Sequence, residues 1–231
     1  MNLQHKLKLD WCSYEAAKYA VDHWHYSKCL PKFKQNWIGV WENLKFIGVI
    51  SFGRSSTPYL GTAYNLTTFE CAELTRIALK KHETPVSKII SIAVKMVKKK
   101  SPGMRLFVSL ADPSQNHVGA VYQASGWKYI GKSSCIRQYF FKGKWRNDSS
   151  LMREMQKFPL LKKTLKSKKI QGKHKYVLAL DKEMAAIINP LAKPYPKRAE
   201  GETKDTLAIH AREGGSLPTS ALHTSSEVKN G

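Results

Sequence analysis

The segment from Glu73 to Trp127 decides the fold class, because strand patterns and helix patterns alternate along it. It opens with ELTRIAL (residues 73–79), whose alternation is typical of a strand. A helix pattern begins near Thr84, and LFVSLA (residues 106–111) is an apolar run typical of a strand covered on both faces. A second, shorter helix pattern covers residues 118–125. The order strand, helix, strand, helix predicts an α/β fold.

The first of these helices has clear start and stop signals. Thr84 stands in the N-cap position and Pro85 at the first helical position, while three lysines, residues 98–100, complement the negative end of the helix dipole. Such a strand–helix–strand unit directs a helix N-terminus toward the carboxyl end of the first strand, where a phosphate-bearing cofactor can bind.

Two sets of motifs resemble known families. The order of parts, with its ending YQASGW (residues 122–127), resembles the GNAT acyltransferase superfamily, although HETPVS (residues 82–87) stands where a glycine-rich phosphate loop is usual. The motifs HYS (residues 25–27), ELTR (residues 73–76) and the stretch from ADP (residues 111–113) to Trp127 resemble the Mom family, which modifies adenine in DNA.

The resemblance implies an enzyme that converts adenine in phage DNA to an N6-carbamoylmethyl-type derivative and shields that DNA from restriction. It implies double-stranded DNA and a small-molecule group donor, acetyl-CoA or a related acyl-CoA, as binding partners. Two parallel strands around Thr75 and Leu110 would separate to hold the pantetheine arm. The diphosphate would then meet four residues at the helix start, with a simple helix-capping role for Ser87 as the alternative: Thr84, Val86, Ser87 and Lys88.

Three residues in this segment are candidate catalytic residues. Tyr122 stands where GNAT enzymes place a tyrosine that protonates the leaving thiolate, with a core aromatic as the alternative. Asp112 follows a buried strand at its carboxyl edge, where it could orient an amine or serve as an ordinary Asp-Pro turn residue. Arg76 places a charge inside an apolar strand, which requires a bound anion or an ion pair with Glu73 or Asp112.

A further candidate cluster, HWHYSKC (residues 23–29), follows an N-terminal helix pattern. His25 could act as a general base, or His25 and Tyr26 could bind iron or another transition metal together with the thiolate in this stretch. A packed or solvated loop is the alternative. Because N6 of adenine is paired in a duplex, the base must also be flipped out. Five aromatic residues are candidates to line its pocket: Trp24, Trp37, Trp41, Tyr59 and Tyr64.

The strong positive charge predicts a polyanionic partner. The net charge is +22 and the sequence pI is about 9.9, so nucleic acid is favoured over an anionic membrane. The four cysteines form no CxxC pair, and no secretory signal or 18-residue apolar run is visible. We therefore expect a protein of the host cell cytoplasm without membrane association, and the choice between monomer and homodimer stays open.

The sequence divides into three parts. Residues 1–141 are predicted to form the catalytic core, a GNAT-like mixed sheet of six or seven strands with helices on both faces, including a hairpin across residues 128–141. Residues 142–196 are predicted to be a basic nucleic-acid-binding extension packed on the core, since residues 142–175 hold 12 Lys and Arg against 2 Asp and Glu. Residues 197–231 are predicted to be disordered. The alternative functions are an acetyltransferase acting on RNA or a protein amine, and a non-catalytic DNA-binding module.

Overall fold

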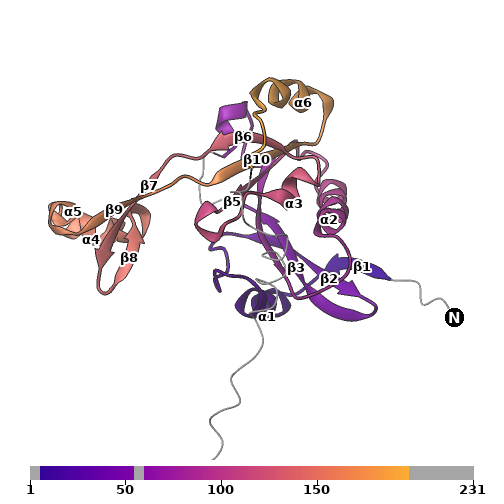
Figure 1. Cartoon of the computed structure of the whole chain (residues 1–231), viewed down its shortest axis with the longest axis horizontal. Coiled ribbons are helices and arrows are strands. Elements are labelled where there is room, and N and C mark those ends of the chain that lie inside the picture. Colours follow the sequence, from indigo (N-terminus) through magenta and orange to yellow (C-terminus); the bar gives the residue numbers. More distant parts are fainter. Residues whose placement is uncertain (1–5, 55–59, 198–231) are drawn as a thin grey trace, which may run out of the picture.

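A seven-stranded mixed sheet forms the centre of the molecule (Figure 1). The computed structural model describes residues 6–54 and 60–197, so residues 198–231 of the predicted tail lie outside the described residues. Only β4 and β5 are parallel, and all other neighbours are antiparallel, which confirms the predicted mixed sheet. The strands, in spatial order, are β1 (Leu7–Trp11), β2 (Gln35–Glu42), β3 (Lys45–Gly53), β4 (Cys71–Leu79), β5 (Leu106–Ala111), β10 (His174–Ala179) and β6 (Lys128–Lys132).

Helices cover both faces of this sheet, as predicted. On one face lie α2 (Val86–Lys100) and α3 (Ala120–Gln123), and on the other lie α1 (Tyr14–Trp24) and α6 (Lys182–Ile188). Among the described residues, no helix combines the length and apolar character that crossing a bilayer requires.

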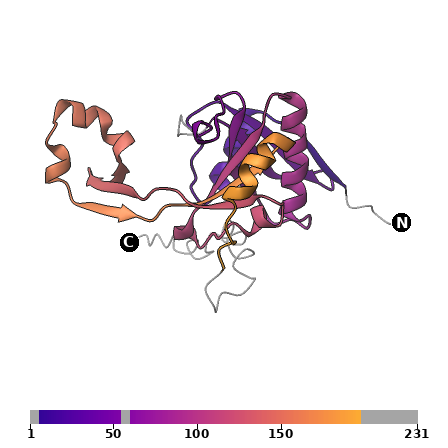
Figure 2. The same ribbon diagram turned by 90° about the horizontal axis from the view of Figure 1, so that it is seen from above.

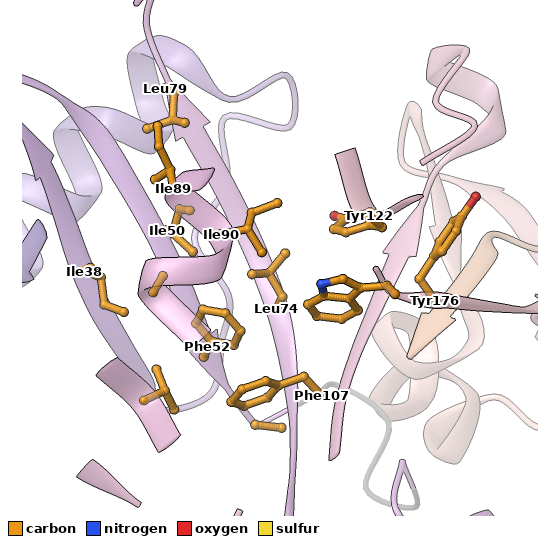
Figure 3. Close-up of a cluster of buried hydrophobic side chains, with 14 of the residues drawn as sticks. Ile38, Ile50, Phe52, Leu74, Leu79, Ile89, Ile90, Phe107, Tyr122 and Tyr176 are labelled. Carbon is orange, nitrogen blue, oxygen red and sulfur yellow. The ribbon is translucent and has the colours of Figure 1, made fainter. Parts of the chain in front are cut away.

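The apolar run of β5 shows how the two faces are built. Leu106 and Val108 pack toward α6, whereas Phe107 between them packs toward α2, and all three are fully buried. Figure 3 shows Phe107 in the same cluster as Ile89 and Ile90 of α2. Each such side chain contributes about 1.5–3 kcal/mol by leaving water. The prediction of a strand covered on both faces is therefore confirmed.

The parallel pair β4 and β5 separates partway along its length. Cα pairing runs only from Cys71 opposite Leu106 to Leu74 opposite Ser109. Beyond that point β4 continues to Leu79 beside β3, while the end of β5 stays paired with β10. The two strands thus diverge after Leu74 and Ser109, at the position where the resemblance to GNAT enzymes places the separation.

The predicted hairpin across residues 128–141 is wrong. β6 pairs with β10 in the central sheet, whereas β7 (Ile136–Phe141) joins β8 (Lys144–Asn147) and β9 (Ser167–Ile170) in a second sheet. The physical reason lies in β10, whose fully buried Tyr176 and Val177 fill the place beside β5. This strand comes from the stretch that was expected to lie outside the core.

Residues 136–170, here called the arm, stand apart from the central sheet in both views (Figures 1 and 2). Besides the second sheet, with strand order β8-β7-β9, the arm contains α4 (Asp148–Lys157) and α5 (Leu161–Thr164). The structure therefore separates the basic stretch into an arm and a part that completes the core.

Candidate active site

The candidate site lies where β4 and β5 separate. It is built by the loop after α1, by β4, by the turn after β5 and by α3. A ring contact joins His25 to Tyr26, electrostatic interactions join His25 to Arg76 and Lys173 and Tyr26 to Tyr122, and an ion pair joins Lys173 to Asp112, so all five predicted catalytic residues belong to one cluster. These residues are His25, Tyr26, Arg76, Asp112 and Tyr122.

Arg76 holds the loop after α1 against β4. Its Nε and Nη2 atoms donate hydrogen bonds to the Cys29 carbonyl oxygen, at 2.9 and 2.8 Å, and its Nη1 donates to the Thr75 carbonyl at 2.6 Å. The guanidinium charge also lowers the pKa of His25, after the larger effect of burial. Arg76 therefore positions the loop that carries His25 and Tyr26.

His25 is buried and neutral at pH 7. Burial, together with the positive charges of Arg76, His117 and Lys173, lowers its pKa to about 3. Its Nδ1 lies 2.8 Å from Ser27 Oγ and accepts a hydrogen bond from the Ser27 N–H at 3.1 Å. Because Nδ1 accepts, the imidazole proton resides on Nε2. This arrangement makes His25 a hydrogen-bond donor through Nε2 and disfavours the predicted general base.

Tyr26 and His117 place aromatic faces at the site. The Tyr26 ring stacks on His25 with centroids 4.5 Å apart, meets His117 edge-on at 5.5 Å, and keeps 47% of its surface exposed. Sequence reasoning missed His117, whose only signal is its position in the turn after Asp112.

The aromatic residues named from the sequence as a base pocket lie elsewhere. Trp24, the last residue of α1, and Trp37 pack in the cluster between α1 and the sheet, Trp41 contacts Phe46, and Tyr64 is buried in the cluster that includes α6. Tyr59 lies outside the described residues. The aromatic surface at the site therefore comes from Tyr26 and His117.

Asp112 is an ionised carboxylate held from two sides. Its Oδ1 accepts hydrogen bonds from the N–H and hydroxyl of Ser114, at 3.0 and 2.7 Å, and its Oδ2 lies 3.1 Å from Lys173 Nζ. Burial raises the pKa of Asp112, but these hydrogen bonds and the Lys173 charge outweigh burial and hold the pKa below its usual value. Lys173, which sequence reasoning missed, reaches Asp112 because β10 pairs with β5.

Tyr122 provides a protonated hydroxyl at the floor of the site. Burial raises its pKa to about 12, and a hydrogen bond with Ser109 offsets part of that rise. The Ser109 hydroxyl also donates to the Leu74 carbonyl at 3.1 Å, at the last paired position before β4 and β5 separate. The Tyr122 hydroxyl is thus fixed at the start of the gap between the strands.

The start of α2 differs from the prediction at Thr84. Pro85, not Thr84, is the N-cap residue, and the N–H and hydroxyl of Thr84 both donate to Glu42 Oε1, at 2.8 and 2.7 Å. The Glu83 N–H donates to the other Glu42 oxygen at 3.0 Å. A carboxylate of the chain therefore occupies the donors of Thr84, which leaves residues 86–88 at the helix start as the candidate diphosphate contacts.

The remaining features fit the acyl-pantetheine part of a CoA thioester. Two parallel strands diverge, the Tyr122 hydroxyl lies at their divergence, and the Trp127 ring packs 5.4 Å from Tyr122. The buried Trp127 Nε1–H has no hydrogen-bond partner among the described residues. A buried donor without a partner costs about 1–3 kcal/mol.

The alternative of an iron site at His25 and Tyr26 has no support in the described part of the chain. No group of three or more His, Cys, Asp or Glu side chains gathers there in a way that could hold a metal ion. The Cys29 thiol instead donates to the Leu30 carbonyl, and Ser27 contacts Nδ1 of His25.

The diverging parallel strands over a buried tyrosine define a mixed α/β protein of GNAT-like arrangement. Comparison with known families is more specific: residues 6–197 match the Mom protein family, and the chain belongs to that family. It is 24% identical over 204 residues to the methylcarbamoylase Mom of Escherichia phage Mu. The matched residues make up 83% of this chain and 84% of that relative.

Solved structures with a similar chain path include two acyl-transfer enzymes. One is a Bacillus subtilis acetyltransferase in complex with CoA, with a TM-score of 0.44, 12% identity, and coverage of 77% of this chain and 100% of that chain. The other is an N-acyl amino acid synthase from uncultured soil microbes, with a TM-score of 0.44, 9% identity, and coverage of 82% of this chain and 99% of that chain.

Proposed function

We propose that this protein is a DNA-modifying transferase that converts adenine to an N6-carbamoylmethyl-type derivative and so protects phage DNA from host restriction nucleases. Membership of the Mom family and similarity to a protein named methylcarbamoylase support the proposal. The observation that carries it is the convergence of His25, Tyr26, Asp112 and Tyr122 where β4 and β5 separate.

On the donor side, the gap between β4 and β5 would hold the pantetheine arm of an acyl-CoA. Val86, Ser87 and Lys88 would contact the diphosphate, because they form the first turn of α2 and a helix N-terminus attracts anions. Such a thioester supplies an activated carbonyl carbon: attack by N6 forms a bond to that carbon and releases the CoA thiolate, which gives an N6-acyl adenine. A carbamoylmethyl group joins N6 to a methylene carbon, so thioester transfer alone does not form it and a further bond change is required. Tyr122, protonated at neutral pH, would give its proton to the leaving group.

On the adenine side, the site must orient a weak nucleophile. The N6 lone pair is delocalised into the ring, and N6 is paired in the duplex, so the base has to leave the stack. Tyr26 and His117 offer aromatic faces on which a flipped base can stack. The Asp112 carboxylate can accept a hydrogen bond from the N6 amino group, and His25 can donate one through Nε2.

Mass spectrometry of nucleosides from DNA of cells that express this protein alone tests the proposal. We expect a new adenine derivative, and its mass identifies the chemistry: acyl transfer joins N6 to a carbonyl carbon, whereas a carbamoylmethyl group joins N6 to a methylene carbon. Unchanged DNA nucleosides in cells that contain soluble protein would contradict the proposal, and acetylated RNA or protein amines in those cells would establish the alternative activity.

A further inference from the structure

The arm carries a concentrated positive charge. Its 35 residues, 136–170, contain eleven Lys and Arg residues against two Asp and Glu residues. One of those two acids, Asp148, is already paired with Lys162 at 3.0 Å. Charge of one sign on a small projecting unit opposes its own folding, so a binding partner of opposite charge is the physical explanation that the arrangement favours.

One face of the arm sheet is open. Helix α4 packs on the face where Tyr139 is buried, and Leu151 of α4 is fully buried as well. Strand register and alternation place a second set of side chains on the opposite face. This open face carries Ile136, Gln138, Phe140, Trp145, Asn147, Lys168 and Ile170.

Contacts within the open face align its polar and aromatic groups. Gln138 Nε2 donates to Asn147 Oδ1 at 3.0 Å, the Phe140 and Trp145 rings lie 5.4 Å apart, and Lys168 Nζ lies 4.3 Å from the centroid of the Trp145 ring. Amide side chains, aromatic rings and lysines are the groups with which proteins contact bases and phosphates.

The base of the arm is fastened to the active site. The Ser133 N–H donates to the Lys173 carbonyl at 2.8 Å, and the Lys173 N–H donates back to Ser133 Oγ at 2.9 Å. A Cβ at Gly172 would lie 1.7 Å from the Ser133 carbonyl oxygen, so only glycine allows the two connecting segments to approach this closely. Lys173 also forms the ion pair with Asp112. The base of the arm therefore lies beside the candidate site.

We propose that the arm binds duplex DNA, with its lysines on the phosphates and the open face of its sheet directed into a groove. This inference rests on the proposed function, because it assigns the substrate of that site a second contact surface. A β-ribbon fits the major groove, and lysines that neutralise phosphates release bound counterions. The amides of Gln138 and Asn147 favour a nucleic acid over a lipid surface, although Met152, Phe158 and Leu160 of the arm are exposed.

Two matched lysine variants test the proposal. The arm variant changes Lys166, Lys168 and Lys169 to Gln, and the control changes Lys95, Lys99 and Lys100 of α2 to Gln. All six side chains are exposed, and each triplet includes one lysine over a tryptophan ring, Lys168 over Trp145 and Lys100 over Trp11. Binding of a labelled duplex is measured by fluorescence anisotropy over a range of salt concentrations, with anionic phosphatidylserine vesicles as the competing surface.

In the arm variant we expect weaker duplex binding. The slope of log K against the logarithm of the salt concentration should be shallower by about one for each lysine, or about three in total. The control should keep the wild-type slope. Equal losses in both variants, an unchanged arm variant, or wild-type binding to vesicles without binding to duplex would each overturn the inference. If the wild type modifies adenine while the arm variant binds normally, only the arm assignment fails. If the wild type leaves nucleosides unchanged, the proposed function itself fails.

Discussion

The central sheet and the arm are built by different physical means. In the sheet, β5 and β10 are covered on both sides, and Phe107, Val108, Tyr176 and Val177 are fully buried. In the described part of the arm, the buried hydrophobic side chains are Tyr139 and Leu151, while lysines surround them. The candidate catalytic residues therefore lie on loops and short elements anchored to a well-packed sheet, whereas the proposed DNA contacts lie on a small unit with little apolar burial.

Removal of the Tyr122 hydroxyl should separate chemistry from binding most sharply. We expect Tyr122→Phe to modify adenine about a hundred- to ten-thousandfold more slowly, because it lacks the proton donor for the leaving group. Its duplex affinity should stay that of the wild type, since the arm is untouched. Single-turnover kinetics and anisotropy measure the two quantities, and a variant with wild-type rate would remove Tyr122 from the mechanism.

Substitutions that leave a cavity in one region should destabilise different parts of the molecule, depending on the region. Phe107→Ala should lower the free energy of unfolding by about 3–5 kcal/mol, because it empties part of the central core. Leu151→Ala should instead open the arm alone, since Leu151 is the fully buried side chain of α4. Urea unfolding and hydrogen exchange distinguish these outcomes. Loss of protection in the central sheet of Leu151→Ala would show that the two regions fold as one unit.

The ion pair between Lys173, at the base of the arm, and Asp112 predicts a change in the pH dependence of the rate. The pKa of Asp112 is held below its usual value partly by Lys173, so in Lys173→Gln that pKa should rise. If activity needs ionised Asp112, the acidic limb of the pH–rate profile should move to higher pH. Lys175→Gln is the control, because Lys175 lies two residues further along, in β10, with its Nζ over the Tyr64 ring. A profile that moves equally in both variants would contradict the specific role of Lys173.

The smallest expected effect concerns Glu42. Its carboxylate lies ahead of α2 and adds negative charge where a diphosphate would bind. Glu42→Gln should therefore bind acyl-CoA about two- to fivefold more tightly, as expected for roughly 0.3–1 kcal/mol at a helix terminus. Isothermal titration calorimetry measures this, and weaker binding by a variant that remains folded would argue against a diphosphate at this terminus.

The core was largely predictable from local patterns. The apolar run at residues 106–111 and the alternation in residues 73–79 each specify a strand, and the resemblance to GNAT enzymes anticipated their separation. The site residues His25, Tyr26, Arg76, Asp112 and Tyr122 could be named because each breaks an apolar pattern or follows a motif. The structure links them through contacts, while their individual roles stay proposals.

What the sequence did not reveal depends on long-range pairing. Nothing local tells that β10 inserts between β5 and β6, so the hairpin across residues 128–141 was a natural but wrong prediction. The same pairing brings Lys173 to Asp112, and the turn after β5 brings His117 to Tyr26. Glu42 was hidden for a similar reason, because its partners Glu83 and Thr84 lie far along the chain.

The most direct test of this division of roles is the yield of modified adenine as a function of duplex concentration, measured by nucleoside mass spectrometry on purified wild type, the arm triple variant and Tyr122→Phe. We predict that a high duplex concentration restores the arm variant to the wild-type rate, because only its affinity is reduced, and that no concentration restores Tyr122→Phe. Recovery of Tyr122→Phe, or an arm variant that stays slow at saturation, would contradict the account.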